Sequence, residues 1–264
     1  MSTDAADRRA LAEGFADLAL AAGAAIMAVH GKADPTAKAD GSPLTEADLR
    51  AHAAILAGLA RLCPGIPVIS EEDAAHRAPG GLRLFILVDP LDGTREFLSG
   101  NGEFTVNIAL VENGAPVAGV VAAPALGRLW AGAAGQGAWC AGTDRPGRQA
   151  IAARQPPEAG LVAVASRSHR DAATDAFLAG LSVAGLRSVG SSLKFCLLAA
   201  GEADVYPRFG PTMEWDTAAG QAVLEAAGGR VVTPEGAPLR YGKPGWRNGP
   251  FIGWGAGPLP PSSS

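Results

Sequence analysis

The stretch Val88-Asp-Pro-Leu-Asp-Gly-Thr-Arg-Glu-Phe97 decides how the rest of the chain is interpreted. The apolar run Leu84 to Val88 predicts a short buried strand that stops just before two carboxylates, Asp89 and Asp92. The Gly93-Thr94 step that follows offers backbone N–H groups at a tight turn or helix start, a geometry that binds phosphate oxygens. Carboxylates for a hard cation beside N–H groups for a phosphate indicate metal-assisted phosphoryl chemistry.

Composition bounds the class of protein. The 264 residues are 48 % hydrophobic, enough for one large domain or two close-packed lobes, and the net charge of −4 without a Lys/Arg-rich run excludes a groove for long nucleic acid. The acidic first residues lack the features of a secretory signal, and the apolar stretch Leu18 to Val29 is too short to cross a bilayer. Three cysteines without metal-ligand spacing suit a reducing compartment. We therefore expect no transmembrane segment and a cytoplasmic protein, either free or peripheral at the inner membrane.

The first half of the chain predicts packing helices followed by antiparallel strands. Apolar residues at helical spacing predict the first helix, Thr45 is an N-cap candidate for the second, and Asn113-Gly114 is a strong hairpin signal. The expected elements are helices over 5–29 and 46–62, strands at 67–70 and 84–88, and an antiparallel meander over 104–112, 116–124 and 129–139.

The composition becomes polar and proline-rich around 143–157, where we place a boundary between lobes. Beyond it strands alternate with helices, which favours an α/β lobe. The expected elements are strands at 161–165, 186–189, 204–208 and 251–254, helices over 171–181, 192–200 and 214–227, and a hairpin turn at 234–236. The predicted division is an N-terminal metal-binding lobe over 1–150, a C-terminal α/β substrate lobe over 151–257, and a disordered tail over 258–264, with a mobile loop over 73–81.

Five acids lie at the ends of predicted elements: Asp40, Glu71, Asp89, Asp92, and Asp216 at the start of the last long helix. Taken singly, each is also explained as a solvated loop acid or a helix cap, and Asp216 as a charge that serves the helix dipole. Their placement after two apolar strands instead favours an oxygen-rich site suited to Mg²⁺. A cysteine or histidine metal site is not supported.

Several motifs carry a resemblance to a known family. Ser70-Glu-Glu72, Asp89-Pro-Leu-Asp-Gly-Thr94 and Trp215-Asp-Thr-Ala-Ala-Gly220 resemble the signatures of the lithium-sensitive, magnesium-dependent phosphatases that include inositol monophosphatase and fructose-1,6-bisphosphatase. Within that superfamily, the segments 38–45, 101–108, 190–196 and 206–211 resemble those of the CysQ-type 3'(2'),5'-bisphosphate nucleotidases. The resemblance covers nearly the whole chain. It implies an α/β (α+β) protein with a layered α/β/α/β/α fold, in which an antiparallel N-terminal sheet lobe and an α/β C-terminal lobe clasp the site.

The resemblance also assigns roles to individual residues. Two or three Mg²⁺ ions would be held by the side chains of Glu71, Asp89, Asp92 and Asp216 and by the carbonyl oxygen of Leu91. The residues assigned to catalysis are Asp40, which would lie beside a further metal and the attacking water, Thr94, which would orient or deprotonate that water, and Glu71. The residues assigned to substrate binding are Gly93, Thr94, His169, Ser191, Lys194, Arg208 and Asp216.

Some positions leave alternatives open. Of the adjacent acids Glu71 and Glu72 only one can point at the site, and the family position favours Glu71. His169 can instead be a packed residue at the start of a helix, and Lys194 a residue on a solvated helix face. Glu214 is an acid where the family pattern has a neutral residue, a departure that would change metal affinity.

The expected function is Mg²⁺-dependent hydrolysis of the 3'-phosphate of adenosine 3',5'-bisphosphate to AMP and phosphate, a step that clears a by-product of sulfate assimilation. The second phosphate of such a substrate gives Lys194 and Arg208 an anion to pair with. 3'-Phosphoadenylyl sulfate is a further candidate substrate. The alternatives are an inositol-monophosphatase-like enzyme of broad specificity and a non-catalytic nucleotide sensor. The only partner expected is the small-molecule substrate, in a monomer or homodimer.

Overall fold

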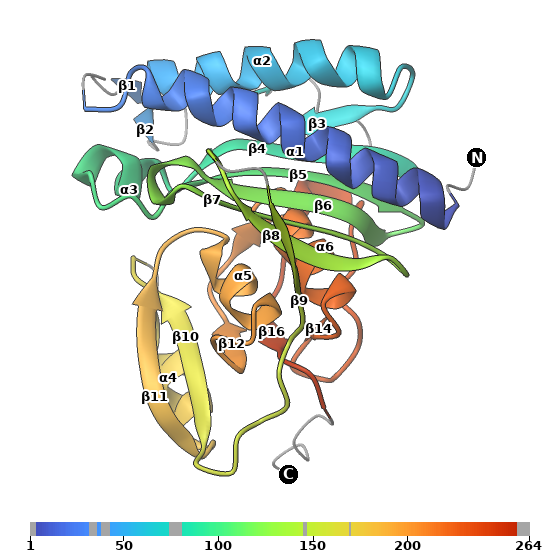
Figure 1. Ribbon diagram of the computed structural model, residues 1–264. Coiled ribbons are helices and arrows are strands. Elements are labelled where there is room, and N and C mark those ends of the chain that lie inside the picture. The colour runs from blue at the N-terminus through green and yellow to red at the C-terminus, as the bar shows by residue number, and fades with distance from the viewer. Residues whose placement is uncertain are drawn as a thin grey trace.

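The computed structural model describes residues 4–31, 36–37, 43–73, 81–144, 147–168 and 170–257. These residues form five layers, helix, sheet, helix, sheet and helix, which confirms the predicted fold (Figure 1). Helices α1 and α2 cover one face of a seven-stranded sheet, and α5 and α6 fill the space between that sheet and a five-stranded one. Helix α4 packs on the outer face of the five-stranded sheet.

The seven-stranded sheet has the order β3-β4-β5-β6-β7-β8-β9; β3 and β4 are parallel and all other neighbours antiparallel, as the meander predicted. The predicted turn is present, with φ 50° at Asn113 and 77° at Gly114. The elements are α1 (Ala5–Met27), β1 (Thr36–Ala37), β2 (Pro43–Leu44), α2 (Glu46–Leu62), β3 (Val68–Ser70), β4 (Leu84–Asp92), α3 (Thr94–Ser99), β5 (Thr105–Glu112), β6 (Ala115–Ala123), η2 (Pro124–Leu126), β7 (Arg128–Ala133), β8 (Gly137–Gly142) and β9 (Arg148–Ile151).

The five-stranded sheet has the order β11-β10-β12-β16-β14, with parallel pairing of β10 to both β11 and β12. Parallel strands joined through helices confirm the α/β character predicted for this half. The elements are β10 (Leu161–Ser166), α4 (Ala172–Ala179), β11 (Val183–Val189), α5 (Leu193–Ala199), β12 (Val205–Arg208), β13 (Thr212–Met213), α6 (Ala218–Ala226), β14 (Arg230–Val232), η3 (Pro244–Trp246), β15 (Arg247–Asn248) and β16 (Phe251–Trp254).

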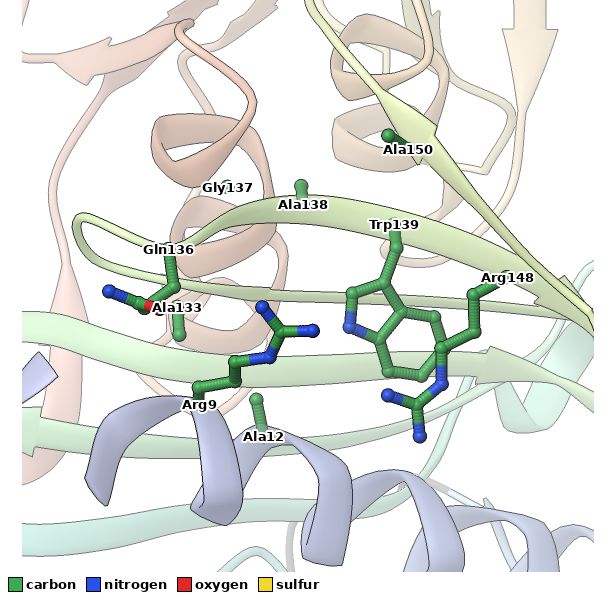
Figure 2. A pocket seen from close by; sticks show the side chains of 9 residues that line it. All are labelled: Arg9, Ala12, Ala133, Gln136, Gly137, Ala138, Trp139, Arg148 and Ala150. Carbon is green, nitrogen blue, oxygen red and sulfur yellow. The ribbon is translucent and has the colours of Figure 1, made fainter. Parts of the chain in front are cut away.

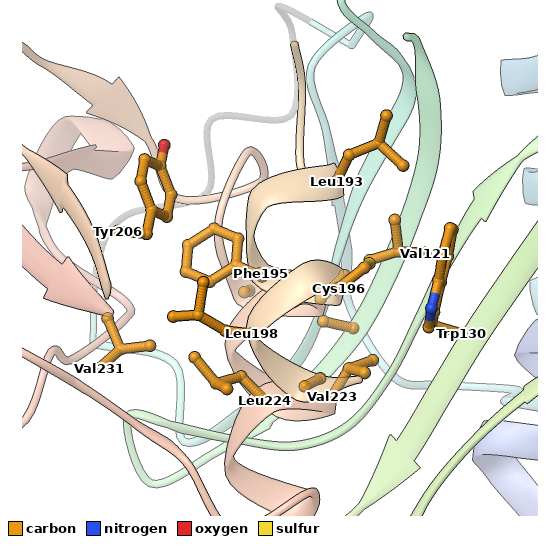
Figure 3. Packing of buried hydrophobic residues seen from close by; sticks show 14 of the residues in the cluster. Val121, Trp130, Leu193, Phe195, Cys196, Leu198, Tyr206, Val223, Leu224 and Val231 are labelled. Atoms are coloured by element: carbon orange, nitrogen blue, oxygen red, sulfur yellow. The ribbon is translucent and has the colours of Figure 1, made fainter. Parts of the chain in front are cut away.

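Strand β5 is covered by helices on both faces, and this explains the apolar residues on both of its faces. Its residues alternate between two hydrophobic clusters: Val106, Ile108 and Leu110 face the α1/α2 layer, whereas Ala109 and Val111 face α5 and α6. A central strand covered by helices on both faces buries both sets of side chains. The hydrophobic cluster that contains Ala109 and Val111 continues through α5 to the five-stranded sheet (Figure 3).

Helix α6 lies unusually close to the seven-stranded sheet because the strands beneath it carry glycine. A Cβ atom on Gly119 of β6 would lie 2.8 Å from the Cβ of Ala222, and one on Gly132 of β7 would lie 2.8 Å from the Cβ of Ala226. Both distances are below van der Waals contact, so alanine at either position would push the helix outward. This packing joins the helix after Asp216 to the sheet that carries Asp89 and Asp92.

Two expected boundaries are wrong. Strand β4 does not stop before the acids but continues to Asp92, because Asp89 pairs with Asn107 and Asp92 with Thr105, and an irregular register between them accommodates Pro90. The last long helix begins at Ala218 rather than at 214, because residues 214–217 form a turn in which Met213 N–H donates to Asp216 Oδ2 at 2.7 Å.

Two further predictions are refined, and a third is not tested. The polar segment around 143–157 contains the exposed edge strand β9, which lacks a hydrophobic pattern. The turn predicted at 234–236 is present, since Gly236 N–H donates to Thr233 O at 2.9 Å and Thr233 N–H donates to Ala237 O at 2.7 Å, but the hairpin that it closes contains only the bridge between Val232 and Pro238. The division into lobes near residue 150 stays a prediction, since α6 packs on the first sheet. The loop residues 74–80 and the tail 258–264 lie outside the described residues.

Helix α1 is the only described helix long and apolar enough to span a membrane by length and composition, with mean hydropathy 1.5 over its best window. Its residues Phe15, Ala19 and Ile26 are fully buried in the cluster formed with α2 and the seven-stranded sheet. A helix that packs against a sheet and a second helix has the same composition. The predicted location of the protein is not tested by this feature and stays a prediction.

Candidate active site

Four carboxylates converge where β3, β4 and the turn before α6 meet; we refer to Glu71, Asp89, Asp92 and Asp216 as the acid cluster. The parallel pairing of β3 and β4 places Ser70 opposite Val88, and Glu71 N–H continues the ladder to Val88 O at 3.1 Å. Glu71 therefore lies beside Asp89, the next residue of β4. Segments more than a hundred residues apart thus contribute to one site.

Burial and mutual repulsion dominate the electrostatics of the acid cluster. Desolvation raises the pKa of Asp89 well above 3.8, and the charges of Glu71, Asp92 and Asp216 raise it further. The pKa of Asp216 is raised by burial and then by Asp92 and Glu71. Burial also raises the pKa of Asp92, but Lys194 and hydrogen bonds from Ser192 and Asn107 partly offset this rise. The cluster lacks enough positive charge of its own.

A polar network positions Asp92. Ser192 Oγ lies 3.0 Å from Asp92 Oδ2 and 2.7 Å from the carbonyl oxygen of Asp216, while Asn107 Nδ2 donates to Ser192 Oγ at 2.9 Å. Sequence reasoning gave no role to Ser192 or Asn107. A signal was present, because Asn107 is an amide inside a strand whose neighbouring residues, from Val106 to Val111, are otherwise apolar. Its Oδ1 atom is buried and has no hydrogen-bond partner within the described residues, which leaves an acceptor facing this site.

The donor set of the acid cluster fits a hard divalent cation. Every candidate ligand is an oxygen, the carboxylates are close enough to raise one another's pKa, and a cation between them would reverse that repulsion. Among the residues that the structure describes, no three His, Cys, Asp or Glu side chains are arranged so that they could hold a metal ion by themselves. Mg²⁺ keeps several waters and is completed by substrate phosphate, so it requires fewer protein ligands than such a group supplies.

The turn after Asp92 has the geometry expected of a phosphate cradle. Gly93 adopts φ 90°, a left-handed conformation that favours glycine, and the short helix α3 begins at Thr94. Thr94 Oγ1 lies 3.4 Å from the carbonyl oxygen of Leu91. Ser191 packs against this turn, with its Cβ 3.4 Å from the position of a Cβ atom on Gly93; it has φ 45°, unusual for a residue with a side chain, and its buried Oγ has no hydrogen-bond partner in the described part of the chain.

Two buried cations border the acid cluster on the side of the second sheet. Lys194, 4 % exposed, donates to the carbonyl oxygens of Val189 and Ser191, so the solvated-face alternative is wrong. Burial lowers its pKa to about 8; Asp92 opposes that shift and Arg208 adds to it. Arg208 is 7 % exposed and donates from Nε to Gly210 O and from a terminal nitrogen to Pro211 O, both at 3.1 Å.

A clasp between the two halves of the chain lies beside these cations. Arg167 donates to both carboxylate oxygens of Glu103, at 2.8 and 3.0 Å, and Glu103 Oε2 also accepts from Gly190 N–H at 2.7 Å. Nearby, Ser168 Oγ donates to Glu96 Oε1 at 2.7 Å. These contacts fix the Gly190 loop, which precedes Ser191, against the segment that follows Asp92. Sequence reasoning noted the segment that contains Glu103 but did not predict the pair.

Two of the predicted site residues, Asp40 and His169, lie outside the described residues. The structure brings the other predicted residues into one region, with metal candidates on the β3/β4 edge and the turn before α6, and substrate candidates on α3, α5 and β12. Their individual roles stay predictions.

A separate pocket of about 230 Å³ lies elsewhere, between α1 and the β8/β9 edge (Figure 2). Arg9, Trp139 and Arg148 border it, and Arg148 stacks on Trp139 while pairing with Glu13. None of the acid-cluster residues lines this pocket. It is therefore not the candidate active site.

Comparison with known proteins agrees with this geometry. The model of the inositol monophosphatase family matches residues 7–251. The 3'(2'),5'-bisphosphate nucleotidase CysQ of Escherichia coli O157:H7 is 48 % identical over 85 % of this chain and 91 % of its own length. The crystal structure of CysQ from Bacteroides thetaiotaomicron, a bacterial member of the inositol monophosphatase family, has a TM-score of 0.78 and 41 % identity, covering 93 % of this chain and 97 % of the other. The inositol monophosphatase of Anabaena sp. is 27 % identical with a TM-score of 0.73, covering 95 % and 92 %. The chain belongs to the inositol monophosphatase family, and within it to the CysQ-type members.

Proposed function

We propose that this protein is a Mg²⁺-dependent phosphomonoesterase that hydrolyses the 3'-phosphate of adenosine 3',5'-bisphosphate to AMP and phosphate. Water adds to phosphorus while the bond to the 3'-oxygen breaks. The 48 % identity to a protein named 3'(2'),5'-bisphosphate nucleotidase supports the substrate class. The acid cluster supports the metal dependence, which is general to the family.

One observation carries the choice of substrate: two buried cations, Lys194 and Arg208, border the acid cluster, and Lys194 is held by the carbonyl oxygen of Ser191, whose Cβ lies 3.4 Å from the position of a Cβ atom on Gly93. Burying a cation is costly unless it meets an anion, and burial already lowers the pKa of Lys194 to about 8. A second phosphate on the substrate would place an anion beside Lys194 and raise its pKa again, which favours the protonated amine that binds it. An inositol monophosphate has no second phosphate.

Different residues of the chain would bind the metal ions, the phosphate and the attacking water. Glu71, Asp89, Asp92, Asp216 and the carbonyl oxygen of Leu91 would hold two or three Mg²⁺ ions. Bound Mg²⁺ supplies Lewis-acid stabilisation of developing negative charge and a source of nucleophile at neutral pH. The N–H groups of Gly93 and Thr94 would bind the phosphate that is cleaved, and the Thr94 hydroxyl would accept or orient a proton of the attacking water.

The remaining assignments follow the motif positions. Asp40 would assist in activating water. Ser191, Lys194 and Arg208 would contact the nucleotide side of the substrate, together with His169. The strained backbone at Ser191 and its unpaired hydroxyl are consistent with a residue that is completed by a ligand.

The deciding experiment measures phosphate release from adenosine 3',5'-bisphosphate and from inositol 1-phosphate, each with Mg²⁺ and with EDTA. We expect rapid, EDTA-sensitive turnover of the nucleotide and at least tenfold lower kcat/KM for inositol 1-phosphate. A preference for inositol 1-phosphate would retain the metal chemistry and reject the assignment of Lys194 and Arg208. If neither substrate is turned over, the result would favour the alternative of a non-catalytic nucleotide sensor.

A further inference from the structure

Glu214, which immediately precedes the Trp215-Asp216 motif, is fully buried and does not join the acid cluster. Its carboxylate accepts from Gly242 N–H at 2.7 Å and from Lys243 N–H at 3.0 Å, and it pairs with Lys243 Nζ at 2.7 Å. A buried carboxylate with two backbone donors and a cation is fully compensated. It has no capacity left to serve as a metal ligand without breaking this arrangement.

The backbone of Glu214 also anchors the turn that presents Asp216. Glu214 N–H donates to Trp246 O at 2.8 Å, and Glu214 O accepts from the N–H groups of Thr217 and Ala218 at 3.3 and 3.0 Å. Asp216 N–H donates to Met213 O at 3.2 Å within the same turn. The conformation of this turn therefore depends on where Glu214 is held.

Lys243 connects the carboxylate to a second group that holds the turn. Lys243 Nζ donates to Asn248 Oδ1 at 3.0 Å, and Asn248 Nδ2 donates to Met213 O at 3.0 Å and to Thr217 Oγ1 at 2.9 Å. Tyr241 OH lies 3.1 Å from Thr217 Oγ1. We define the Glu214 network as Glu214, Lys243, Asn248, Thr217 and Tyr241.

We propose that Glu214 is a positioning residue for the metal site: through the Glu214 network it holds the 213–217 turn so that the Asp216 carboxylate faces Glu71 and Asp89. The residues on both sides of Asp216 are fixed, Met213 by Asn248 and Thr217 by Asn248 and Tyr241. Asp216 itself remains directed at the other acids, whose charges raise its pKa. Partners of this kind, one layer behind a metal ligand, typically change metal affinity by 10–100-fold when removed.

The inference rests on the proposed metal-dependent function and concerns a residue outside the predicted ligand set. A purely structural role for Glu214 makes a different prediction, because it affects the stability of the fold and leaves metal affinity alone. The chain offers a matched control. Asp204 is also a buried carboxylate that pairs with a partly exposed cation, Arg154 at 2.7 Å, and accepts from a backbone N–H, that of Val162 at 2.7 Å. Asp204 lies just before the start of β12. Arg208, which borders the acid cluster, lies at the other end of that strand.

The test compares Glu214→Gln with Asp204→Asn in the full-length protein. Mn²⁺ binding is measured by the electron paramagnetic resonance of free Mn²⁺ without substrate, Mg²⁺ is used as competitor, and melting temperature is recorded without metal. We expect Mn²⁺ binding to weaken about tenfold or more in Glu214→Gln and less than twofold in Asp204→Asn. Both variants should have a lower melting temperature than the wild type. Phosphate release at saturating Mg²⁺ should recover in Glu214→Gln more fully than at low Mg²⁺.

Equal Mn²⁺ affinity in Glu214→Gln, Asp204→Asn and the wild type would overturn the proposal. If Glu214→Gln does not fold, Asn248→Ala provides the same test. This variant removes the contacts to Met213 and Thr217 and leaves the ion pair of Glu214 intact. Wild-type Mn²⁺ affinity in Asn248→Ala would also overturn the proposal. Failure of the proposed function has a different signature: the wild type binds Mn²⁺ but releases no phosphate from adenosine 3',5'-bisphosphate. A wild type that binds no Mn²⁺ would overturn both.

Discussion

The Glu214 network and the acid cluster lie on either side of the turn at Asp216, and their buried carboxylates are compensated in different ways. In the Glu214 network, a fully buried carboxylate meets a lysine and two backbone donors, and Lys243 extends the network to Asn248. In the acid cluster, buried carboxylates meet one another, and burial and repulsion together raise the pKa of Asp89 and of Asp216. The first region is complete within the chain. The second is stabilised only when protons or an external cation supply positive charge.

This difference separates structural from functional burial. Hydrogen bonds that complete a buried ion pair offset much of its desolvation penalty, so the Glu214 network can hold a backbone conformation without a bound ligand. Buried carboxylates without compensating positive charge destabilise the fold. Such destabilising groups are concentrated at functional sites, where a bound ligand offsets the lost stability. The predictions below test the contrast.

The largest effect is expected from Asp92→Asn. The variant removes one candidate metal ligand but keeps a side chain that can hydrogen-bond Ser192 and Asn107, so we expect phosphate release to fall about 1000-fold or more while the protein stays folded. Steady-state kinetics at saturating Mg²⁺ and circular dichroism measure the two properties. Wild-type turnover in a folded variant would remove Asp92 from the ligand set.

Addition of Mg²⁺ should stabilise the wild type by about 2.7 kcal/mol at 100 times its dissociation constant, equivalent to roughly 5–10 °C in melting temperature. The stabilisation arises because the cation neutralises the acid cluster only in the folded state. Differential scanning calorimetry with Mg²⁺ and with EDTA measures it. The matched control is Asp89→Asn, which should retain only a small part of the shift; an equal shift in that variant would place the ion elsewhere.

The metal-free protein should lose stability as pH rises. The folded-state pKa values of Asp89, Asp92 and Asp216 lie above the ordinary value of 3.8, so the folded state binds more protons than the unfolded state between those limits. The free energy of unfolding therefore falls as pH increases from about 3.8 through the raised values. Urea denaturation at several pH values in EDTA measures the slope, which Mg²⁺ should flatten. A slope of opposite sign would contradict the electrostatic account.

Replacing Lys194 with methionine tests the second-phosphate contact. Loss of a charge-assisted interaction should raise KM for adenosine 3',5'-bisphosphate about 10–100-fold, since such hydrogen bonds contribute roughly 1.5–3 kcal/mol. The carbonyl oxygens of Val189 and Ser191 lose a donor, so stability must be recorded as well. The internal control is turnover of adenosine 3'-monophosphate, which lacks the second phosphate and should change much less. A parallel loss on both substrates would make Lys194 structural.

The contrast between the two regions was only partly visible in the sequence. Asp89, Asp92 and Asp216 could be singled out because apolar strands and glycine-rich turns surround them, and these local patterns also predicted α2 and its Thr45 cap. The antiparallel meander followed from the hydrophobic alternation and the Asn113-Gly114 turn, whereas the layered fold followed from the family resemblance.

The Glu214 network could not be predicted in this way. Glu214 and Lys243 are 29 positions apart, and nothing in either local sequence specifies that the carboxylate turns away from Asp216 toward Gly242. The same reason applies to Ser192, which meets Asp92 across a hundred residues, and to β9, whose exposed residues carry no hydrophobic pattern. Long-range pairing of polar side chains depends on the packing of the layers, whereas periodicity reports only local burial.

The smallest effect is expected at the clasp, where Glu103 pairs with Arg167. This guanidinium is 46 % exposed, and exposed ion pairs contribute only about 0–1 kcal/mol, so Glu103→Gln should lower the melting temperature by a few degrees at most. Glu103 also accepts from Gly190 N–H, next to Ser191, and a glutamine oxygen can keep that bond. We therefore expect KM for the bisphosphate to change less than threefold and Mn²⁺ affinity not at all. Arg167→Met should behave likewise; a large change in Mn²⁺ affinity in either variant would mean that the clasp, rather than the Glu214 network alone, sets the geometry of the acid cluster.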